Sequence, residues 1–213
     1  AMTGAFIDAF VPSGSGGLSS PDQPVFGSDG NLYVSDRFAG AIRRYNGVSG
    51  ACIDVFVSDG ALSGFVDFTF GPDGNIYASQ FNAADDVHFS ILRYSGVTGA
   101  FMDVFASSDQ FVSPSGIVFG PDGNLYVSGL NSGNVLRFNG NTGAFIDVFV
   151  PAGSGVPGAD YLAFGPDGSL YVAFHGSGIL RFDGTTGVFI DEFVPLGSGG
   201  LSVPKGVLFV HQP

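Results

Sequence analysis

The sequence has few basic residues, and this scarcity limits what the protein can bind. Only seven of its 213 residues are Lys or Arg, and the formal net charge is −12. Phosphate binding needs clustered positive charge, so this composition argues against nucleic acid and against anionic membrane surfaces as partners. No apolar run approaches the ~20 residues that span a bilayer, so membrane insertion is not expected either.

Cysteine and glutamate each occur once. A single cysteine, Cys52, excludes an intrachain disulfide. In the repeats described below it takes the place of Phe101, Phe145 and Phe189, so we expect a buried apolar residue rather than a reactive thiol. The single glutamate, Glu192, is expected in an outer strand beside Asp191, far from any central channel.

Glycine and phenylalanine are abundant, with 35 and 23 residues, whereas only 12% of residues are charged. This composition suits short buried strands joined by tight turns, and the chain is long enough for one domain with a substantial core. A phrase that begins Phe-Gly-Pro-Asp-Gly-Asn occurs four times with small changes, starting at Phe26, Phe70, Phe119 and Phe164. The spacing between these four starting positions is typical of the repeat length in stacked-repeat or propeller architectures.

Each repeat contains the signals of four strands. In the third repeat the expected strands are 115–119, 124–128, 134–138 and 144–150, and the Asp122-Gly123 pair marks the first hairpin. The turn also explains the aspartates at this position, which lack the further ligands of a calcium loop. No helix signal interrupts the strands, and the content matches one propeller blade.

One spacing predicts how the last two strands of each repeat pair. An Arg on the third strand is followed ten residues later by an Asp on the fourth. If the strands fold about the intervening turn, the two charges lie opposite each other and help to fix the register. The four pairs are Arg44/Asp54, Arg93/Asp103, Arg137/Asp147 and Arg181/Asp191.

These units, with Gly-Pro-Asp-Gly-Asn-Leu-Tyr-Val-Ser, Val-Leu-Arg-Phe and Thr-Gly-Ala-Phe-Ile-Asp as examples, resemble NHL-type β-propeller repeats. More broadly, the chain is similar to the propeller group of the streptogramin lyases and the SMP-30/gluconolactonase family. The resemblance covers nearly the whole chain and implies the fold more strongly than the activity. It also resembles repetitive propellers of bacterial secreted or surface proteins, which together with the low lysine content predicts an extracellular or cell-surface location.

We therefore expect an all-β chain, a β-propeller of four-stranded antiparallel blades with four full repeats plus a spare strand at each end. The blades are expected at about 22–57, 66–106, 115–150 and 160–194, and the spare strands at 3–11 and 205–210. The chain could be a fragment of a larger ring, a small ring with loose ends, or a unit of a homo-oligomer. Exposed strand edges favour pairing between chains.

Function is expected where the repeats differ, in the loops between second and third strands on one face of the propeller. Acidic, amide, basic and imidazole side chains in these loops are the candidate ligand-binding residues. They are Asp36, Arg37, Asn82, Asp85, Asp86, His88, Asn131, Asn134 and His175. Asp85, Asp86 and His88 could supply ligands to a divalent metal, but their spacing matches no specific motif.

The enzyme hypothesis meets a difficulty in the sequence. The resemblance implies His with Glu in the lyases and a divalent metal held by Glu, Asn and Asp in the gluconolactonases, and the single Glu192 cannot supply these ligands. Asp67 and Asp160 begin inner strands near the channel, but no evident His pair accompanies them. The main expectation is therefore a non-catalytic scaffold for self-assembly or for binding a carbohydrate, small molecule or protein, without a cofactor. The alternative is a lyase or lactonase-like hydrolase with a metal- or His-dependent site at the channel mouth.

Overall fold

The computed structural model describes residues 6–58, 60, 62, 67–81, 89–108, 113–153 and 158–209. They form four antiparallel sheets of four strands, and in each sheet the strands lie side by side in sequence order. The first sheet contains β1 (Pro21–Phe26), β2 (Leu32–Asp36), β3 (Ala41–Tyr45) and β4 (Cys52–Val57), and the second β5 (Phe68–Phe70), β6 (Ile76–Phe81), β7 (Phe89–Tyr94) and β8 (Phe101–Ser107). The third contains β9 (Pro114–Phe119), β10 (Leu125–Gly129), β11 (Val135–Phe138) and β12 (Phe145–Val150), and the fourth β13 (Ala159–Phe164), β14 (Leu170–Phe174), β15 (Gly178–Phe182) and β16 (Phe189–Pro195).

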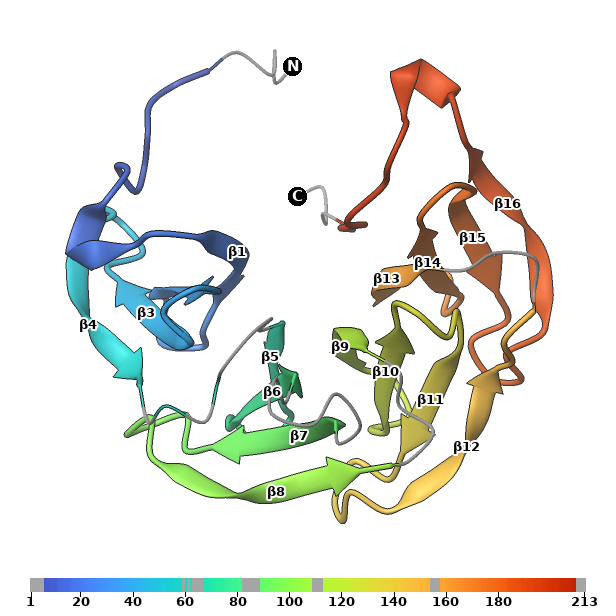
Figure 1. Ribbon diagram of the computed structural model, residues 1–213, viewed down its shortest axis with the longest axis horizontal. Helices are drawn as coiled ribbons and strands as arrows, with labels where there is room; N and C mark the ends of the chain where they lie inside the picture. Colours follow the sequence, from blue (N-terminus) through green and yellow to red (C-terminus); the bar gives the residue numbers. More distant parts are fainter. Residues whose placement is uncertain are drawn as a thin grey trace.

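The four sheets are the blades of a β-propeller, which confirms the predicted fold class. Figure 1 shows them as an arc around a centre, with β1, β5, β9 and β13 innermost and β4, β8, β12 and β16 outermost. The arc is open between the N-terminal segment and β16. Two single-turn 3-10 helices, η1 (Ser15–Gly17) and η2 (Ser198–Gly200), flank the strands. Among the described residues, no helix is long and apolar enough to cross a membrane.

The repeated turn between the first two strands of a blade is held by its aspartate. In the first blade, Asp29 Oδ1 accepts a hydrogen bond from the N–H of Asn31 at 3.0 Å, and Asp29 Oδ2 accepts one from the Tyr33 hydroxyl at 3.1 Å. Gly30 lies between them with a φ of 76°, which L side chains rarely adopt. The same aspartate–tyrosine bond recurs in the other three blades, so the predicted turn role is confirmed.

The predicted Arg–Asp pairing of the outer strands is also confirmed. In the third blade, Arg137 on β11 lies opposite Asp147 on β12. Its Nε and Nη2 atoms donate to the two carboxylate oxygens at 3.1 and 2.5 Å. The other three blades have the same two bonds. These partly exposed pairs fix the register of the outer hairpin, which an uncharged pair would leave less determined.

Adjacent blades pack through a repeated aromatic cluster. Tyr33 of the first blade contacts Phe56 of its own outer strand and Phe70 of the next inner strand, both edge-on, with ring centroids 5.1 and 5.0 Å apart. Equivalent clusters join the second blade to the third and the third to the fourth. At the end of the arc, Phe209 packs on Tyr171 at 4.8 Å, in the place where a following inner strand would put its phenylalanine.

The two segments expected as spare strands differ from the prediction. Over the described residues 6–11 and 205–209 neither is a strand, because neither is hydrogen-bonded into one of the four sheets. They still occupy strand positions. A Cβ on Gly50 would lie 1.7 Å from the Phe10 carbonyl oxygen, just as one on Gly99 would lie 1.9 Å from that of Phe56. Phe10 therefore lies where a preceding blade would place its outer strand.

Cys52 is exposed, so the expectation of a buried apolar residue is wrong. It is the first residue of the outermost strand β4, whose outer face meets solvent. The phenylalanines that take this place in the other blades are also 40–49% exposed. The repeat therefore keeps an apolar residue here without burying it fully.

Candidate functional site

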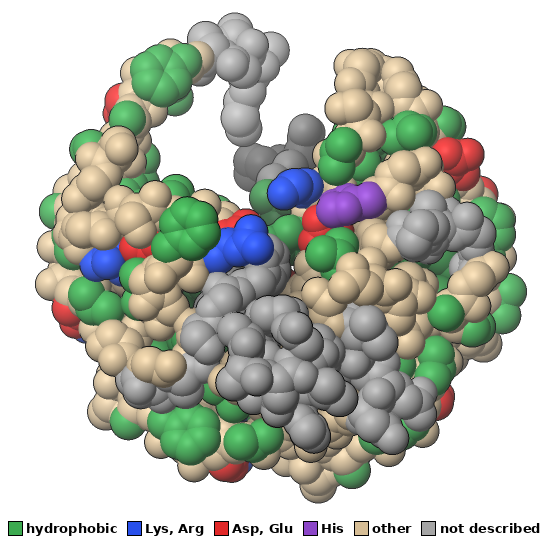
Figure 2. All heavy atoms as spheres, in the orientation of Figure 1, with side chains coloured by type: hydrophobic (Ala, Val, Ile, Leu, Met, Phe, Trp, Pro, Cys, Tyr) green, Lys and Arg blue, Asp and Glu red, His purple; other side chains and the backbone are tan. Residues whose placement is uncertain are grey.

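In the first, third and fourth blades, the variable loops after the second strands lie at one end of the strands, around the centre of the propeller. The residue that follows each second strand has the same backbone role in three blades, because its N–H donates to a carbonyl just before the inner strand. These bonds run from Arg37 to Ser20, from Leu130 to Ser113 and from His175 to Gly158. One scaffold position thus carries a guanidinium, an isobutyl group or an imidazole. Figure 2 shows a histidine with acidic and basic side chains around the central opening on this face.

A chain of three polar side chains lies between the third and fourth blades. His175 Nε2 lies 2.7 Å from Asp160 Oδ2, and the Ser115 hydroxyl donates to Asp160 Oδ1 at 2.5 Å. The Asp160 side chain is only 6% exposed, whereas that of His175 is 35% exposed. A carboxylate accepts hydrogen bonds, so Nε2 carries the proton and Nδ1 of the neutral ring is left as a base.

Two further carboxyl groups, those of Asp67 and Asp22, belong to the inner edge of the blades. Asp67 precedes β5 and is fully buried, and its oxygens accept the N–H groups of Phe68 and Ile117 at 2.9 and 3.0 Å. Burial outweighs these two bonds and raises the pKa of Asp67 well above its usual range, and the charges of Asp22 and Asp160 add to the shift. Asp67 therefore lies in a buried and acidic environment.

Tyr161 joins the last blade directly to the first. Its hydroxyl, on β13, donates to Asp22 Oδ1 on β1 at 3.2 Å. Burial raises the pKa of Tyr161, and the neighbouring carboxylates of Asp67, Asp22 and Asp160 raise it further. Tyr161 therefore stays a neutral donor, and it bridges the inner strands although the arc is open at its outer edge.

The structure places the predicted residues in different environments. Asp36 is buried, and its carboxylate accepts bonds from Arg43 Nε at 2.9 Å, from the N–H groups of Ser19 and Ser20, and from the Ser19 hydroxyl. Burial opposes ionisation, but together these bonds hold the pKa of Asp36 below its usual range. Asp36 therefore anchors the loop before β1.

The remaining predicted residues that the structure describes differ in exposure. Arg37 is exposed at the channel-mouth end of β2, and Asn131 is exposed in the β10–β11 turn. Asn134 is buried in that turn, where its Oδ1 accepts a hydrogen bond from the Ser132 hydroxyl at 2.5 Å. Asn82, Asp85, Asp86 and His88 lie outside the described residues. Among the described members of the predicted set, His175 joins the polar chain with Asp160 and Ser115.

The partners of His175 are not evident from the sequence. Asp160 is expected near the channel without a histidine beside it, and the His175–Asp160 contact corrects this expectation. A usable signal was present, because Asp22, Ser115 and Asp160 each lie four residues before the phenylalanine that ends their inner strand. The repeat therefore varies at this inner position as it varies in the loops.

The described residues do not fit a metal ion. Among them, no three His, Cys, Asp or Glu side chains lie together in a group that could hold one. The Asp160 oxygens are engaged by Ser115 and His175, and the Asp67 oxygens by two backbone N–H groups.

No family model and no curated protein matches this sequence. Among solved structures, the chain is similar to the gluconolactonase XC5397 of Xanthomonas campestris, with a TM-score of 0.67 and 19% identity over 88% of this chain and 65% of that one. It is also similar to a chain of a nidogen/laminin complex, with a TM-score of 0.68 and 16% identity over 84% and 65%. For virginiamycin B lyase of Staphylococcus aureus the TM-score is 0.61 and the identity 19% over 81% and 55%.

These similarities confirm, at the level of fold, the resemblance to gluconolactonase-like and streptogramin lyase-like propellers. This chain spans 55–65% of the length of those three structures. The main functional expectation, a non-catalytic scaffold, is contradicted because the structural neighbours include a gluconolactonase and streptogramin B lyases. The alternative stated with it, a lyase or lactonase-like hydrolase, agrees better with them.

Proposed function

We propose that this protein is an acid–base enzyme, a lyase or lactonase-like hydrolase, with His175 at the channel mouth as its proton-transferring group. One observation carries the proposal. His175 Nε2 is held 2.7 Å from the nearly buried Asp160 carboxylate, while the imidazole keeps a third of its surface open. The similarity in fold to a gluconolactonase and to streptogramin B lyases supports the reaction classes.

The geometry assigns a role to each member of the polar chain. Asp160 accepts a hydrogen bond from the Nε2–H group, so it orients the ring and stabilises the imidazolium that forms when Nδ1 takes up a proton. Ser115 is a positioning residue, because its hydroxyl donates to Asp160 and its Oγ is buried. It is therefore not a nucleophile activated by His175, since that role needs a bond from the serine hydroxyl to the imidazole.

Both reaction classes need such a base. In a lactonase-like hydrolysis, Nδ1 removes a proton from water as the water oxygen attacks the ester carbonyl. The bond between the carbonyl carbon and the ring oxygen then breaks, and the imidazolium returns the proton to that oxygen. In a lyase reaction, Nδ1 removes a proton from the carbon next to a carbonyl, and the carbon–oxygen bond breaks to leave a double bond. The product mass separates the two, because hydrolysis of a cyclic ester adds one water and elimination adds nothing.

The test uses D-glucono-1,5-lactone and the cyclic ester quinupristin as probes, with acid release and product mass as readouts. We expect turnover of one of them and a loss of about 10²–10⁴-fold in kcat/KM for His175→Gln, the range that a general base contributes. Thr185→Val, in an exposed turn at the opposite end of the strands, is the control and should keep full activity. Unchanged turnover in His175→Gln, or no turnover of either probe, would contradict the proposal.

An extracellular or cell-surface location and a small-molecule partner go with this proposal. The low lysine content supports the location, and the central opening lined by charged side chains supports a small polar substrate rather than nucleic acid.

A further inference from the structure

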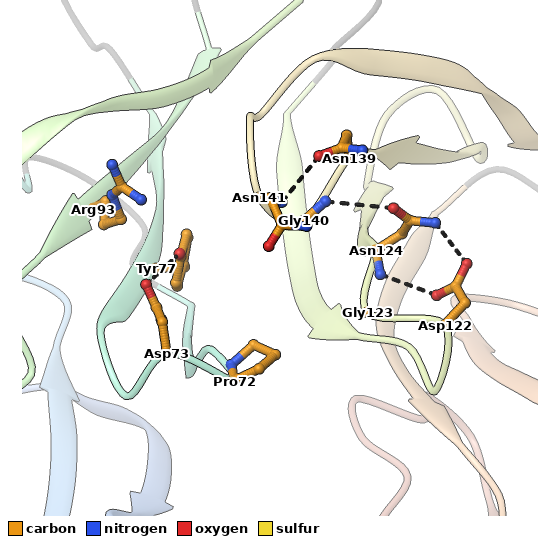
Figure 3. Close-up of a pocket in the computed structure, with 10 residues that line it drawn as sticks. All are labelled: Pro72, Asp73, Tyr77, Arg93, Asp122, Gly123, Asn124, Asn139, Gly140 and Asn141. Atoms are coloured by element: carbon orange, nitrogen blue, oxygen red, sulfur yellow. Dashed lines mark hydrogen bonds between the residues drawn. The ribbon is translucent and has the colours of Figure 1, made fainter.

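A polar pocket lies between the second and third blades, at the end of the strands opposite to His175. Its volume is about 340 Å³, within the range of small-molecule sites. Antiparallel order puts the β5–β6, β9–β10 and β11–β12 turns at this end, and these turns form much of its wall. Figure 3 shows Asp73 and Tyr77 of the second blade facing the turn of Asn139, Gly140 and Asn141 of the third.

Part of the wall belongs to the scaffold and part is particular to this junction. Asp73, Tyr77 and Arg93 are the repeated turn, core and register residues. The pair of turn amides is particular, because the third blade has asparagine at both of the turn positions that line the pocket. The equivalents of Asn139 and Asn141 are Asn46 and Val48 in the first blade, Ser95 and Val97 in the second, and Asp183 and Thr185 in the fourth.

These amides have hydrogen-bonding groups to spare. Asn139 Oδ1 accepts bonds from the N–H groups of Asn141 and Thr142, both at 3.0 Å, which holds the turn and leaves the amide nitrogen. Within the described part of the chain, neither Asn139 Nδ2 nor the Asn141 side chain forms a hydrogen bond. An amide supplies both donors and an acceptor, as a ligand hydroxyl requires.

The charges at the pocket select against anionic ligands. Burial opposes ionisation of Asp73, but bonds from Asn75 and Tyr77 outweigh it and hold the pKa of Asp73 below its usual range. Bonds from Asn124 and Tyr126 act in the same way on Asp122. Both carboxylates therefore repel anions. The guanidinium of Arg93 is engaged by Asp103, so it does not reverse this field.

We propose that this pocket binds a neutral saccharide. Free amide donors and acceptors beside ionised carboxylate acceptors match a ring of hydroxyl groups, which both donate and accept hydrogen bonds. The site lies at the other end of the strands from His175, so the proposal stands independently of the catalytic one.

The test follows the backbone N–H signals of Gly123 and Gly140, which line the pocket, by NMR. The intact chain is titrated with D-glucose, D-galactose, D-mannose, N-acetyl-D-glucosamine and cellobiose, each to about 50 mM, a range that reveals millimolar affinity. The pocket variant is Asn139→Ser with Asn141→Val, which copies the second-blade turn and is therefore known to suit the scaffold. The control is Asp183→Ser with Thr185→Val, the same change in the fourth blade.

We expect saturable shifts at Gly123 and Gly140 with at least one sugar, an affinity loss of about tenfold or more in the pocket variant, and no loss in the control. Absence of saturable shifts with all five sugars would overturn the proposal. So would shifts that survive unchanged in the pocket variant. Shifts confined to the channel-mouth loops would also overturn it, and would instead place the sugar at the proposed catalytic site.

Discussion

The first and fourth blades are built from the same repeat, but their polar side chains occupy different positions and have different roles. In the first, Asp36 and Arg43 form a buried ion pair at 2.9 Å that anchors the loop before β1. In the fourth, the same positions carry Phe174 and Leu180, which pack in the core. The fourth blade instead places its polar pair, Asp160 and His175, at the central opening. Polar side chains can therefore stabilise the fold in one blade and be available for proton transfer in another.

The largest expected effect on stability comes from breaking the ion pair of the first blade. Asp36→Ala leaves the nearly buried Arg43 guanidinium without its carboxylate, which should reduce the free energy of unfolding by about 3–5 kcal/mol. The double variant Asp36→Phe with Arg43→Leu copies the fourth blade and should recover part of that loss. Urea denaturation measures both. A double variant as unstable as the single one would contradict the equivalence of the two blades.

A second variant cuts the link between the two blades. Tyr161→Phe removes the hydroxyl that donates to Asp22, and a hydrogen bond to a charged group contributes about 1.5–3 kcal/mol. We expect the loss of stability to fall near the lower end of this range, because Asp22 is only half-buried. Thermal unfolding checks it. An unchanged midpoint would show that the first and last blades do not depend on this bridge.

A third prediction concerns pH. The pKa of Asp67 is raised in the folded state, so the native protein binds more protons than the unfolded one above the ordinary value of 3.8. Stability should therefore fall as pH rises from 3.8 towards the native pKa, by at most about 1.4 kcal/mol per pH unit.

Asp67→Asn should remove this contribution to the slope of the unfolding free energy against pH. Denaturation at a series of pH values measures the slope. Asp22→Asn and Asp160→Asn, one in each of the compared blades, should each reduce it, because their charges contribute to the shift. A slope that is identical in Asp67→Asn and in the natural chain would contradict the assignment.

The smallest effect is expected at the outer hairpins, which are alike in every blade. Arg44→Met and Arg137→Met each remove a half-exposed ion pair, so each should cost less than about 1 kcal/mol. The two losses should also agree, because the bond lengths are the same in both blades. Guanidinium chloride denaturation of the two variants tests this. A large difference between them would show that the outer strands are not equivalent.

The fold could be predicted from the sequence because its signals are local. The Asp-Gly turn sets the first hairpin, and the ten-residue Arg–Asp spacing sets the last. The site depends on how separate blades pack. Ser115 and Asp160 are 45 residues apart and meet only across the junction of the third and fourth blades. The prediction that Cys52 is buried is wrong for a related reason. Its exposure depends on which face of the outermost strand meets solvent, and the residue type does not reveal this.

The imidazole of His175 is the central group of the proposed site, and ¹⁵N NMR of the histidine rings over a series of pH values tests its tautomer. His175→Gln identifies the signal by its disappearance. We predict that the neutral form of the ring carries its proton on Nε2 and leaves Nδ1 unprotonated, because Nε2 faces the Asp160 carboxylate at 2.7 Å. In Asp160→Asn this preference should weaken. A ring protonated at Nδ1 in the natural chain, or one unaffected by Asp160→Asn, would contradict the claim that the fourth blade holds the catalytic base.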